Sequence, residues 1–354
     1  MITLLEGGWL AMCLRAVFAA LLLLLGGCAD LGYYLQSVQG QMEINAARRP
    51  LDATLADDAT APVLKRRLQR AAAIRAFAID TLKLPDNASY RSYADLQRPY
   101  VVWNVFAAGA LTLEPQRWCF PFAGCVGYRG YFSREAADGF ADGLREAGLD
   151  VHVAGVPAYS TLGWFDDPLL NTFIHYPDYE LARLIFHELA HQVVYVPGDS
   201  EFNESFAMAV ESAGLELWLA QEGDVAMREA AAQAASRRAA VSALLQSVRS
   251  ELAALYRLRI APDSMRERKA ESLADAQQRY RVLKAGWNGY AGYDALFAGL
   301  NNAQLAAFTL YHAWLSALQS VFERGNSDFN AFYAEARRLA ALPKEAREAQ
   351  LAAP

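Results

Sequence analysis

The 354-residue sequence lacks several features that would assign it to a simple class of protein. It has no excess of positive charge, because 33 Lys and Arg against 39 Asp and Glu give a net charge of −6. The composition therefore indicates neither a nucleic-acid partner nor a polybasic membrane surface. No internal repeat occurs at solenoid periods. With 54% hydrophobic and only 20% charged residues, the chain is too apolar for disorder and is typical of a globular protein with one large core or two lobes.

The sequence also lacks an apolar run long enough to cross a bilayer comfortably. Residues 16–28 form a short apolar stretch that ends in small residues and follows Arg15, which predicts a signal peptide. The L-G-G-C at 25–28 resembles a bacterial lipobox, which implies cleavage after residue 27 and a lipid on Cys28. Ala29 is not the Asp associated with inner-membrane retention, so the resemblance implies an outer-membrane anchor facing the periplasm. An ordinary signal peptide or a membrane anchor is the alternative.

Cysteine is scarce, with four residues in the whole chain. Cys13 lies in the predicted signal peptide and Cys28 is the expected lipidation site. The remaining pair, Cys119 and Cys125 in WCFPFAGC, would lie in an oxidising compartment, which predicts a disulfide. The alternative, a metal-binding pair, lacks a nearby second Cys or His.

Two different patterns divide the rest of the sequence. Residues 64–176 mix β-branched and aromatic runs with helical periodicity, which predicts a small α/β lobe. Its expected strands are 100–108, 126–133 and 149–156, and its expected helices are 65–85 and 134–149. Residues 177–354 show helical patterns, with helices expected at 177–195, 200–221, 301–324 and 328–342 and a long helical hairpin at 226–259 and 264–286. The predicted fold class is α+β and predominantly helical, and 28–63 is the anchor-proximal segment, with a helix near 32–48.

An H-E-x-x-H motif at 187–191 is the strongest chemical signal. His187 and His191 are four residues apart, so they lie on one helix face and can bind one zinc ion. Glu188 lies beside the first His, where a carboxylate can accept a proton from a zinc-activated water. The motif therefore predicts a site for one zinc ion per chain, with Glu188 as the general base.

The third protein ligand has four candidates downstream, namely Asp199, Glu201, Glu204 and Glu211. Glu204 and Glu211 are seven residues apart and share one helix face, about 10.5 Å apart along the axis. One of them can bind zinc while the other accepts a hydrogen bond from a ligating His. Asp199 and Glu201 are expected to cap the helix start instead.

A resemblance to a known family indicates which of Glu204 and Glu211 binds zinc. NESFAMAVE (203–211) resembles the N-E-G-F-A-x-x-x-E that follows H-E-x-x-H in the aminopeptidase N family of gluzincin peptidases. The resemblance implies that Glu204 binds zinc and that Glu211 supports His187. The interval from His191 to Glu204 is shorter than in that family, and the position of Glu211 matches thermolysin better. We favour Glu204, because a shortened turn between antiparallel helices is easier to accommodate than a changed helix-face motif.

The mature sequence is also similar to a bacterial family of lipoproteins that carry the label aminopeptidase. The similarity covers nearly the whole mature chain. Its segments are GYYLQSVQGQ (32–41), PDNASYRSYADLQRPYVVWNVFAA (85–108), WCFPFAGC, GVPAYSTLGWFDDP (155–168), FHELAHQ, FNESFA and LNNAQL (300–305).

An aminopeptidase must hold the free ammonium group of its substrate. Asp166 and Asp167, just upstream of the metal helix, are the candidates. The G-x-M-E-N motif with which aminopeptidase N relatives perform this task is absent.

Such an enzyme also needs an electrophilic donor for the developing oxyanion. Aminopeptidase N relatives use a Tyr on a later element, and this resemblance implies Tyr311 in FTLYHAW, with His312 as the next choice. Tyr195, Tyr159 and His175 stay open as alternatives.

The expected function is therefore a lipid-anchored zinc peptidase that faces the periplasm and hydrolyses peptides or proteins, with aminopeptidase activity as the first choice. Two alternatives stay open: an endopeptidase of envelope protein quality control, and a non-enzymatic zinc-containing envelope lipoprotein that binds a partner. Glu188 argues against the second, because a structural zinc site has no use for a general base.

Overall fold

A computed structural model describes residues 32–120, 124–158, 160–161, 165–312 and 314–352. The chain divides into two compact units, Met1–Ala46 and Ala47–Pro354. The described part of the first unit belongs to a helix over residues 32–47. Within the described residues, no helix has the length and apolar character that a membrane span requires. The signal peptide and Cys28 lie outside the described residues.

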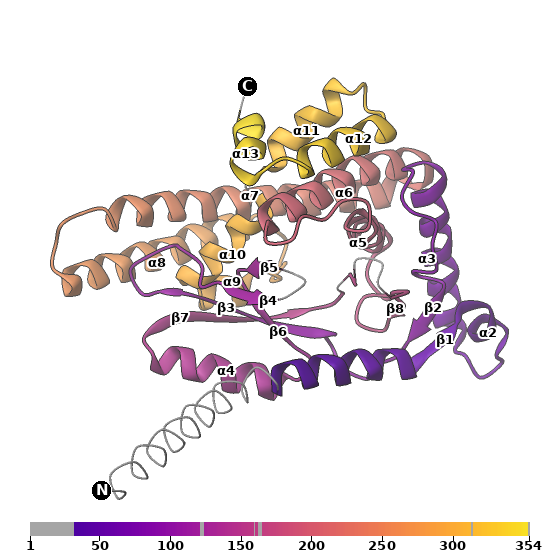
Figure 1. The fold of residues 1–354 in the computed structure, drawn as a ribbon, viewed down its shortest axis with the longest axis horizontal. Coiled ribbons are helices and arrows are strands. Elements are labelled where there is room, and N and C mark those ends of the chain that lie inside the picture. The colour runs from indigo at the N-terminus through magenta and orange to yellow at the C-terminus, as the bar shows by residue number, and fades with distance from the viewer. Residues whose placement is uncertain (1–31, 121–123, 159, 162–164, 313, 353–354) are drawn as a thin grey trace, which may run out of the picture. The chain divides into compact units, whose positions relative to one another are not determined.

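The second unit contains a small antiparallel sheet in the order β6-β3-β7, built from β3 (Val102–Gly109), β6 (Arg129–Tyr131) and β7 (Leu149–Val156). Strand β3 is buried along almost its entire length, which explains a sequence that is apolar apart from Asn104. Figure 1 shows the sheet between α4 (Arg134–Glu146) and α10 (Asn302–His312). Phe106 packs with Ala303 of α10, and Tyr131 contacts Phe140 of α4.

Two smaller sheets were not expected from the sequence. One joins β1 (Arg48–Pro50), β2 (Ser92–Ala94) and β8 (Leu169–Leu170), and the other is the hairpin of β4 (Trp118–Phe120) and β5 (Gly124–Val126). Strands of two or three residues are too short to show a period, so sequence patterns do not reveal them. The expected strand at 126–133 is divided between the ends of β5 and β6.

The helical part follows the sequence pattern closely. Helices α5 (Asp178–Ala190) and α6 (Ser200–Glu222) pack against each other, and α7 (Val225–Leu255) with α8 (Pro262–Ala285) forms the predicted long hairpin. The predicted helix at 301–324 is divided into α10 and α11 (Leu315–Arg324). The remaining helices are α2 (Leu51–Ala56), α3 (Pro62–Asp80), α9 (Asp294–Ala298), α12 (Phe329–Ala340) and α13 (Lys344–Ala352). The α+β, predominantly helical class is confirmed.

Candidate metal centre

Three side chains from α5 and α6 meet at the contact between these helices. The Nε2 atoms of His187 and His191 are 3.2 Å apart. Glu204 Oε2 lies 3.3 Å from the Nε2 of His187 and 3.8 Å from the Nε2 of His191. The three residues form a group that could hold a metal ion.

The spacing of these atoms is that of a tetrahedral site. Zinc–nitrogen and zinc–oxygen bonds of about 2.0–2.1 Å place neighbouring ligand atoms of a tetrahedron about 3.3 Å apart. The three separations, 3.2, 3.3 and 3.8 Å, lie at or slightly above this value. Two imidazole nitrogens and a carboxylate oxygen are also the donor set of a catalytic zinc site with an open fourth position. The residues present therefore fit a metal ion of this type.

Glu211 lies behind the metal group, two turns further along α6. Its Oε2 is 3.1 Å from the Nδ1 of His187, so the imidazole can donate its free N–H to this carboxylate while its Nε2 faces the other ligands. The guanidinium of Arg183 also binds the Glu211 carboxylate. Although burial opposes ionisation, Arg183 and His187 lower the pKa of Glu211 to about 2.

The support for His187 extends to a third helix. Arg183 Nη1 donates to Glu180 on the same helix at 2.9 Å, and Arg238 of α7 donates to the other oxygen of Glu180 at 2.7 Å. The sequence analysis missed Arg183, yet a signal was present. It lies one helical turn before His187, on the same face, where its side chain can meet a carboxylate from the neighbouring helix.

Glu188, the expected general base, lies in a buried and charged environment. Its environment raises its pKa from the ordinary value of 4.5 to about 7, chiefly through burial, with Glu204 and Asp167 adding like-charge repulsion. The imidazole of His187 acts in the opposite direction. A carboxylate with a pKa near neutrality is suited both to accept and to return a proton.

The turn between the two helices is fixed by its own polar contacts. The side chain of Asn203 closes it, because its Oδ1 accepts from Val196 N at 2.8 Å and its Nδ2 donates to Val196 O at 2.9 Å. Asp199 caps α6 by accepting from Phe202 N at 3.2 Å. The buried guanidinium of Arg347 on α13 donates to Asp199 Oδ2 at 2.6 Å. Helix α13 thus supports the first turn of α6, and Glu204 follows directly after that turn.

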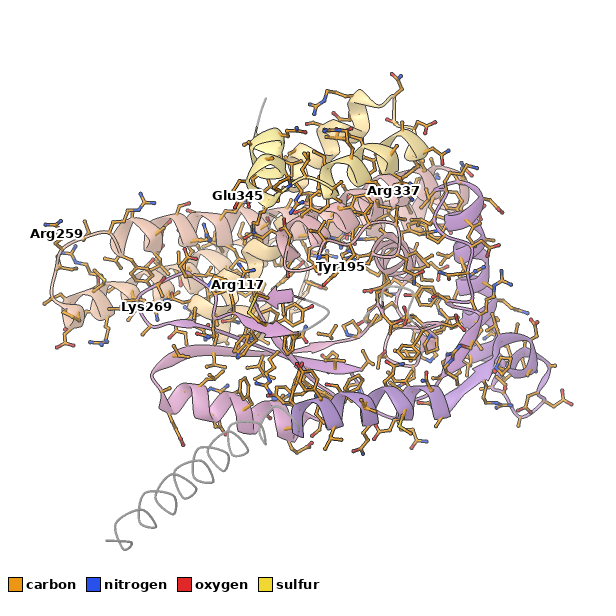
Figure 2. The ribbon with its side chains drawn as sticks, in the orientation of Figure 1. Arg117, Tyr195, Arg259, Lys269, Arg337 and Glu345 are labelled. Atoms are coloured by element: carbon orange, nitrogen blue, oxygen red, sulfur yellow. A yellow bond between two sulfur atoms is a disulfide. The ribbon has the colours of Figure 1, made fainter. Side chains whose placement is uncertain are left out.

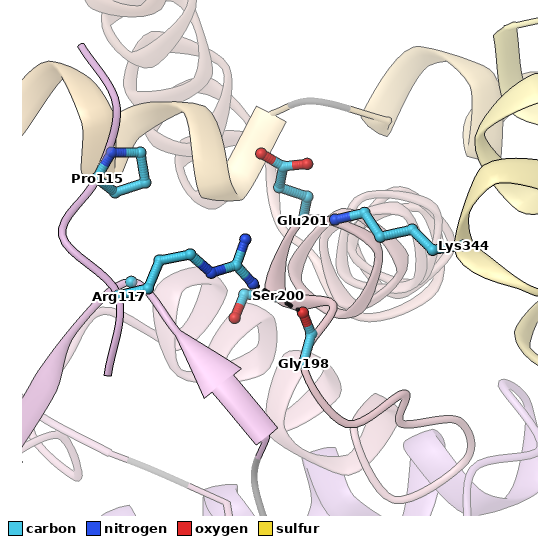
Figure 3. A pocket seen from close by; sticks show the side chains of 7 residues that line it. Pro115, Arg117, Gly198, Ser200, Glu201 and Lys344 are labelled. Carbon is cyan, nitrogen blue, oxygen red and sulfur yellow. Dashed lines mark hydrogen bonds between the residues drawn. The ribbon is translucent and has the colours of Figure 1, made fainter. Parts of the chain in front are cut away.

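The β4–β5 hairpin packs on the same turn. The predicted disulfide between Cys119 and Cys125 is present and joins the two strands of this hairpin. A Cβ on Gly124 would lie 2.6 Å from the backbone nitrogen of Gly198, so only glycine permits this close approach. Arg117 of the adjoining segment donates to the Gly198 carbonyl at 3.1 Å, and Figure 3 shows this bond in a small pocket also lined by Ser200, Glu201 and Lys344.

The two candidate ammonium-binding residues differ sharply in environment. The Asp166 side chain is 54% exposed, and its nearest basic partner is Arg48 at 3.7 Å. Asp167 is buried, and Thr161 donates to its carboxylate through its hydroxyl at 2.7 Å and its backbone N–H at 3.1 Å. Burial raises the pKa of Asp167, because these hydrogen bonds offset it only in part.

The loop at 86–90 forms hydrogen bonds both with Asp167 and with Gln192, which follows His191. The side-chain amide of Gln192, next to His191, accepts from Asn87 Nδ2 at 2.5 Å and donates to Ser89 Oγ at 3.1 Å. The Ser89 hydroxyl also accepts from Asp167 N at 3.3 Å. Arg75 of α3 is buried beneath the loop and donates to Ser89 O at 2.8 Å. The sequence analysis missed this network, because its members are about a hundred residues apart in the chain.

Candidate oxyanion donors are only partly described. Tyr311 and His312 belong to the last turn of α10, but their side chains, like Tyr159, lie outside the described residues. His175 is exposed. Tyr195, labelled in Figure 2, lies in the turn between α5 and α6, and burial together with Glu204 raises its pKa.

Tyr90 was not considered in the sequence analysis. Its φ of 61° is unusual for a bulky side chain and marks a strained position. Its backbone N–H donates to Asp167 O at 2.6 Å, and burial, with the charges of Glu188 and Asp167, raises its pKa well above 10. The Tyr90 phenol therefore lies close enough to Glu188 and Asp167 for their charges to act on it.

Comparison of the whole chain with known protein families identifies the family to which it belongs. A family model described as "Putative aminopeptidase" matches residues 32–351. This is nearly the whole described chain, so the protein belongs to that family, and the family supports a peptidase. Neither the curated proteins nor the solved structures contain a match.

Proposed function

We propose that this protein is a zinc-dependent peptidase of the gluzincin type, with His187, His191 and Glu204 as the metal ligands. One observation carries the proposal. The two Nε2 atoms and Glu204 Oε2 form a triangle with the edges of a tetrahedral zinc site, next to a carboxylate whose pKa is about 7. Membership of a family described as aminopeptidases is consistent with it.

The protein residues have distinct tasks in this proposal. A bound zinc ion supplies Lewis-acid chemistry that makes a water molecule acidic near neutral pH. Glu188 accepts the proton from the attacking water and delivers it to the leaving amine. Glu211 holds the Nδ1 proton of His187 and thereby fixes the tautomer and orientation of that ring. Tyr311 stays the proposed oxyanion donor, and Tyr195 and Tyr90 are the described tyrosines to test beside it.

Aminopeptidase activity is the first choice, and Asp167 is the proposed partner of the substrate ammonium. A buried carboxylate without a close cationic partner gains most from an incoming ammonium group. Asp167 is buried, and burial raises its pKa although the charge of Arg48 acts in the opposite direction. It lies close enough to Glu188 to raise the pKa of that group. Asp166 is exposed and lies 3.7 Å from Arg48, so it is the weaker candidate.

We further propose that the mature chain begins at Cys28, carries a lipid there, and faces the periplasm from the outer membrane. The L-G-G-C sequence at 25–28 motivates this part of the proposal. The Cys119–Cys125 disulfide is consistent with an oxidising compartment. Metabolic labelling with a fatty acid tests it, since the label should appear on the wild-type protein and not on Cys28→Ser.

The test of the activity is a peptide-library digest that compares free and acetylated N-termini. The wild-type protein should contain one zinc per chain and release N-terminal residues from free peptides only. Glu188→Gln should keep the zinc and lose at least about a hundredfold in turnover. Protein without stoichiometric metal, or full activity in Glu188→Gln, would refute the peptidase proposal.

Asp167 and Asp166 provide a matched pair of variants that tests the preference for a free substrate N-terminus. Asp167→Asn should raise KM for free peptides and reduce the preference for a free N-terminus, whereas Asp166→Asn should leave both unchanged. If wild-type protein instead cleaves free and acetylated peptides equally at internal bonds, the endopeptidase alternative is correct.

A further inference from the structure

Exposed apolar side chains gather on the helix over residues 32–47. Among the described residues, twelve large hydrophobic side chains are exposed, and four of these lie on this one helix. They are Tyr34 at 41%, Leu35 at 61%, Val38 at 58% and Met42 at 65% exposure. A helix of sixteen residues therefore carries one third of them, a concentration that calls for a partner.

These four residues form one stripe, within which the exposed Asn45 also lies near its C-terminal end. At 100° per residue, Val38, Met42 and Leu35 lie about 40°, 80° and 100° around the helix from Tyr34, so the stripe spans about 100°. Glu43 lies about 180° from Tyr34, on a polar side where Gln39 Nε2 donates to its carboxylate at 3.2 Å. The helix is therefore amphipathic.

We propose that this stripe rests on the surface of the lipid bilayer, with the helix lying in the plane of the interface. The inference rests on the proposed lipid at Cys28. Only three residues separate Cys28 from Gly32, the first described residue of the helix, and three residues span at most about 14 Å. A lipid on Cys28 thus holds this part of the helix near the membrane surface.

The chemistry of the stripe fits a lipid surface. Aliphatic and thioether side chains enter the boundary between headgroups and acyl chains, and a Tyr is favoured at that depth. The helix has no Lys or Arg between residues 32 and 47, so its contact does not depend on anionic lipid. Four apolar side chains bind a bilayer weakly from solution, but a tether of a few residues makes the contact intramolecular and raises its effective concentration.

Met42 and Glu43 provide a matched pair for the test. They are consecutive residues, equally far from the anchor, and they lie about 100° apart on the helix. The mature protein of the proposal, beginning at Cys28, is prepared with a photo-crosslinking amino acid at either position. Because Cys119 and Cys125 are joined, the Cys28 thiol can be coupled selectively to a maleimide phospholipid in vesicles of phosphatidylethanolamine and phosphatidylglycerol.

Position 42 should give at least fivefold more phospholipid adduct than position 43, and the ratio should not change with salt or with the phosphatidylglycerol content. Equal yields at the two positions would overturn the proposal, as would an adduct from position 42 to a second copy of the chain. Chemical coupling makes the result independent of lipidation in the cell, which the fatty-acid labelling of Cys28→Ser reports separately.

Discussion

The two sides of the candidate metal centre are held by different means. His187 is supported by a chain of charged groups on three helices, from Glu211 through Arg183 and Glu180 to Arg238. Glu204 stands one turn into α6, and its position depends on the preceding turn at 196–199, which is closed by Asn203, capped by Asp199 and packed under a disulfide hairpin.

His187 and Glu204, two of the candidate ligands, are therefore oriented by different kinds of contact. Charges buried between the helices act directly on the candidate ligands, because Arg183 and His187 lower the pKa of Glu211 and Glu211 lies 3.1 Å from the Nδ1 of His187. The contacts around the turn touch no ligand atom and act only on backbone position. Changes on the first side should alter metal affinity, and changes on the second side should chiefly alter stability.

Loss of Glu204 should have the largest effect. Glu204→Ala removes the only ligand that α6 contributes to the triangle, so the purified protein should contain no stoichiometric zinc and show no peptidase activity. Glu211→Ala is the matched comparison on the same helix face, and it should weaken zinc binding by about 10–100-fold. Zinc analysis with competing chelators measures both. The opposite ranking would make Glu211 the ligand.

Removal of Arg347 should destabilise the turn that precedes Glu204. Arg347→Met leaves the buried Asp199 carboxylate with only the longer contact to Lys344 at 3.8 Å, which should cost up to about 3 kcal/mol of the free energy of unfolding in urea. Zinc affinity of the folded variant should change little. Exposed Arg337, also labelled in Figure 2, is the control, and Arg337→Met should cost less than about 0.5 kcal/mol. A chelator-sensitive loss of zinc in folded Arg347→Met would remove the distinction between the two sides.

Glu188 should make the metal-free protein less stable as the pH rises. Its pKa is about 7 in the folded protein and 4.5 ordinarily, so between these values the folded state holds a proton that the unfolded state releases. The free energy of unfolding should therefore fall between pH 4.5 and 7 by up to about 3 kcal/mol. Glu188→Gln should lack this contribution, as urea titrations of metal-free protein at both pH values would show. Identical pH dependence in both proteins would refute it.

Removal of the disulfide should have the smallest effect. Replacing Cys119 and Cys125 by Ser opens a short loop, which should cost about 2 kcal/mol of unfolding free energy. Because the hairpin only packs on the turn, metal stoichiometry should be retained. Thermal unfolding and zinc analysis of the double variant, beside reduced wild-type protein, measure this. Complete loss of zinc would show that the hairpin is required to place Glu204.

Local patterns were sufficient for much of the fold. The composition and helical pattern of residues 226–286 predicted the long hairpin of α7 and α8, and the β-branched and aromatic runs predicted strands β3 and β7, because these signals lie within single elements. Short strands β1, β2 and β8 were not predicted, since each is formed by pairing with a segment distant in the chain.

The sequence by itself determined which residue types can meet a metal. Four-residue spacing puts His187 of α5 and His191, which caps that helix, on one face with Glu188 beside them, and no tertiary contact is needed for that conclusion. Only the tertiary structure decided that Glu204 lies near both Nε2 atoms while Glu211 faces Nδ1, because that depends on how α5 packs on α6. The same holds for Asp166 and Asp167, which are neighbours in the sequence and differ only in what the fold places around them.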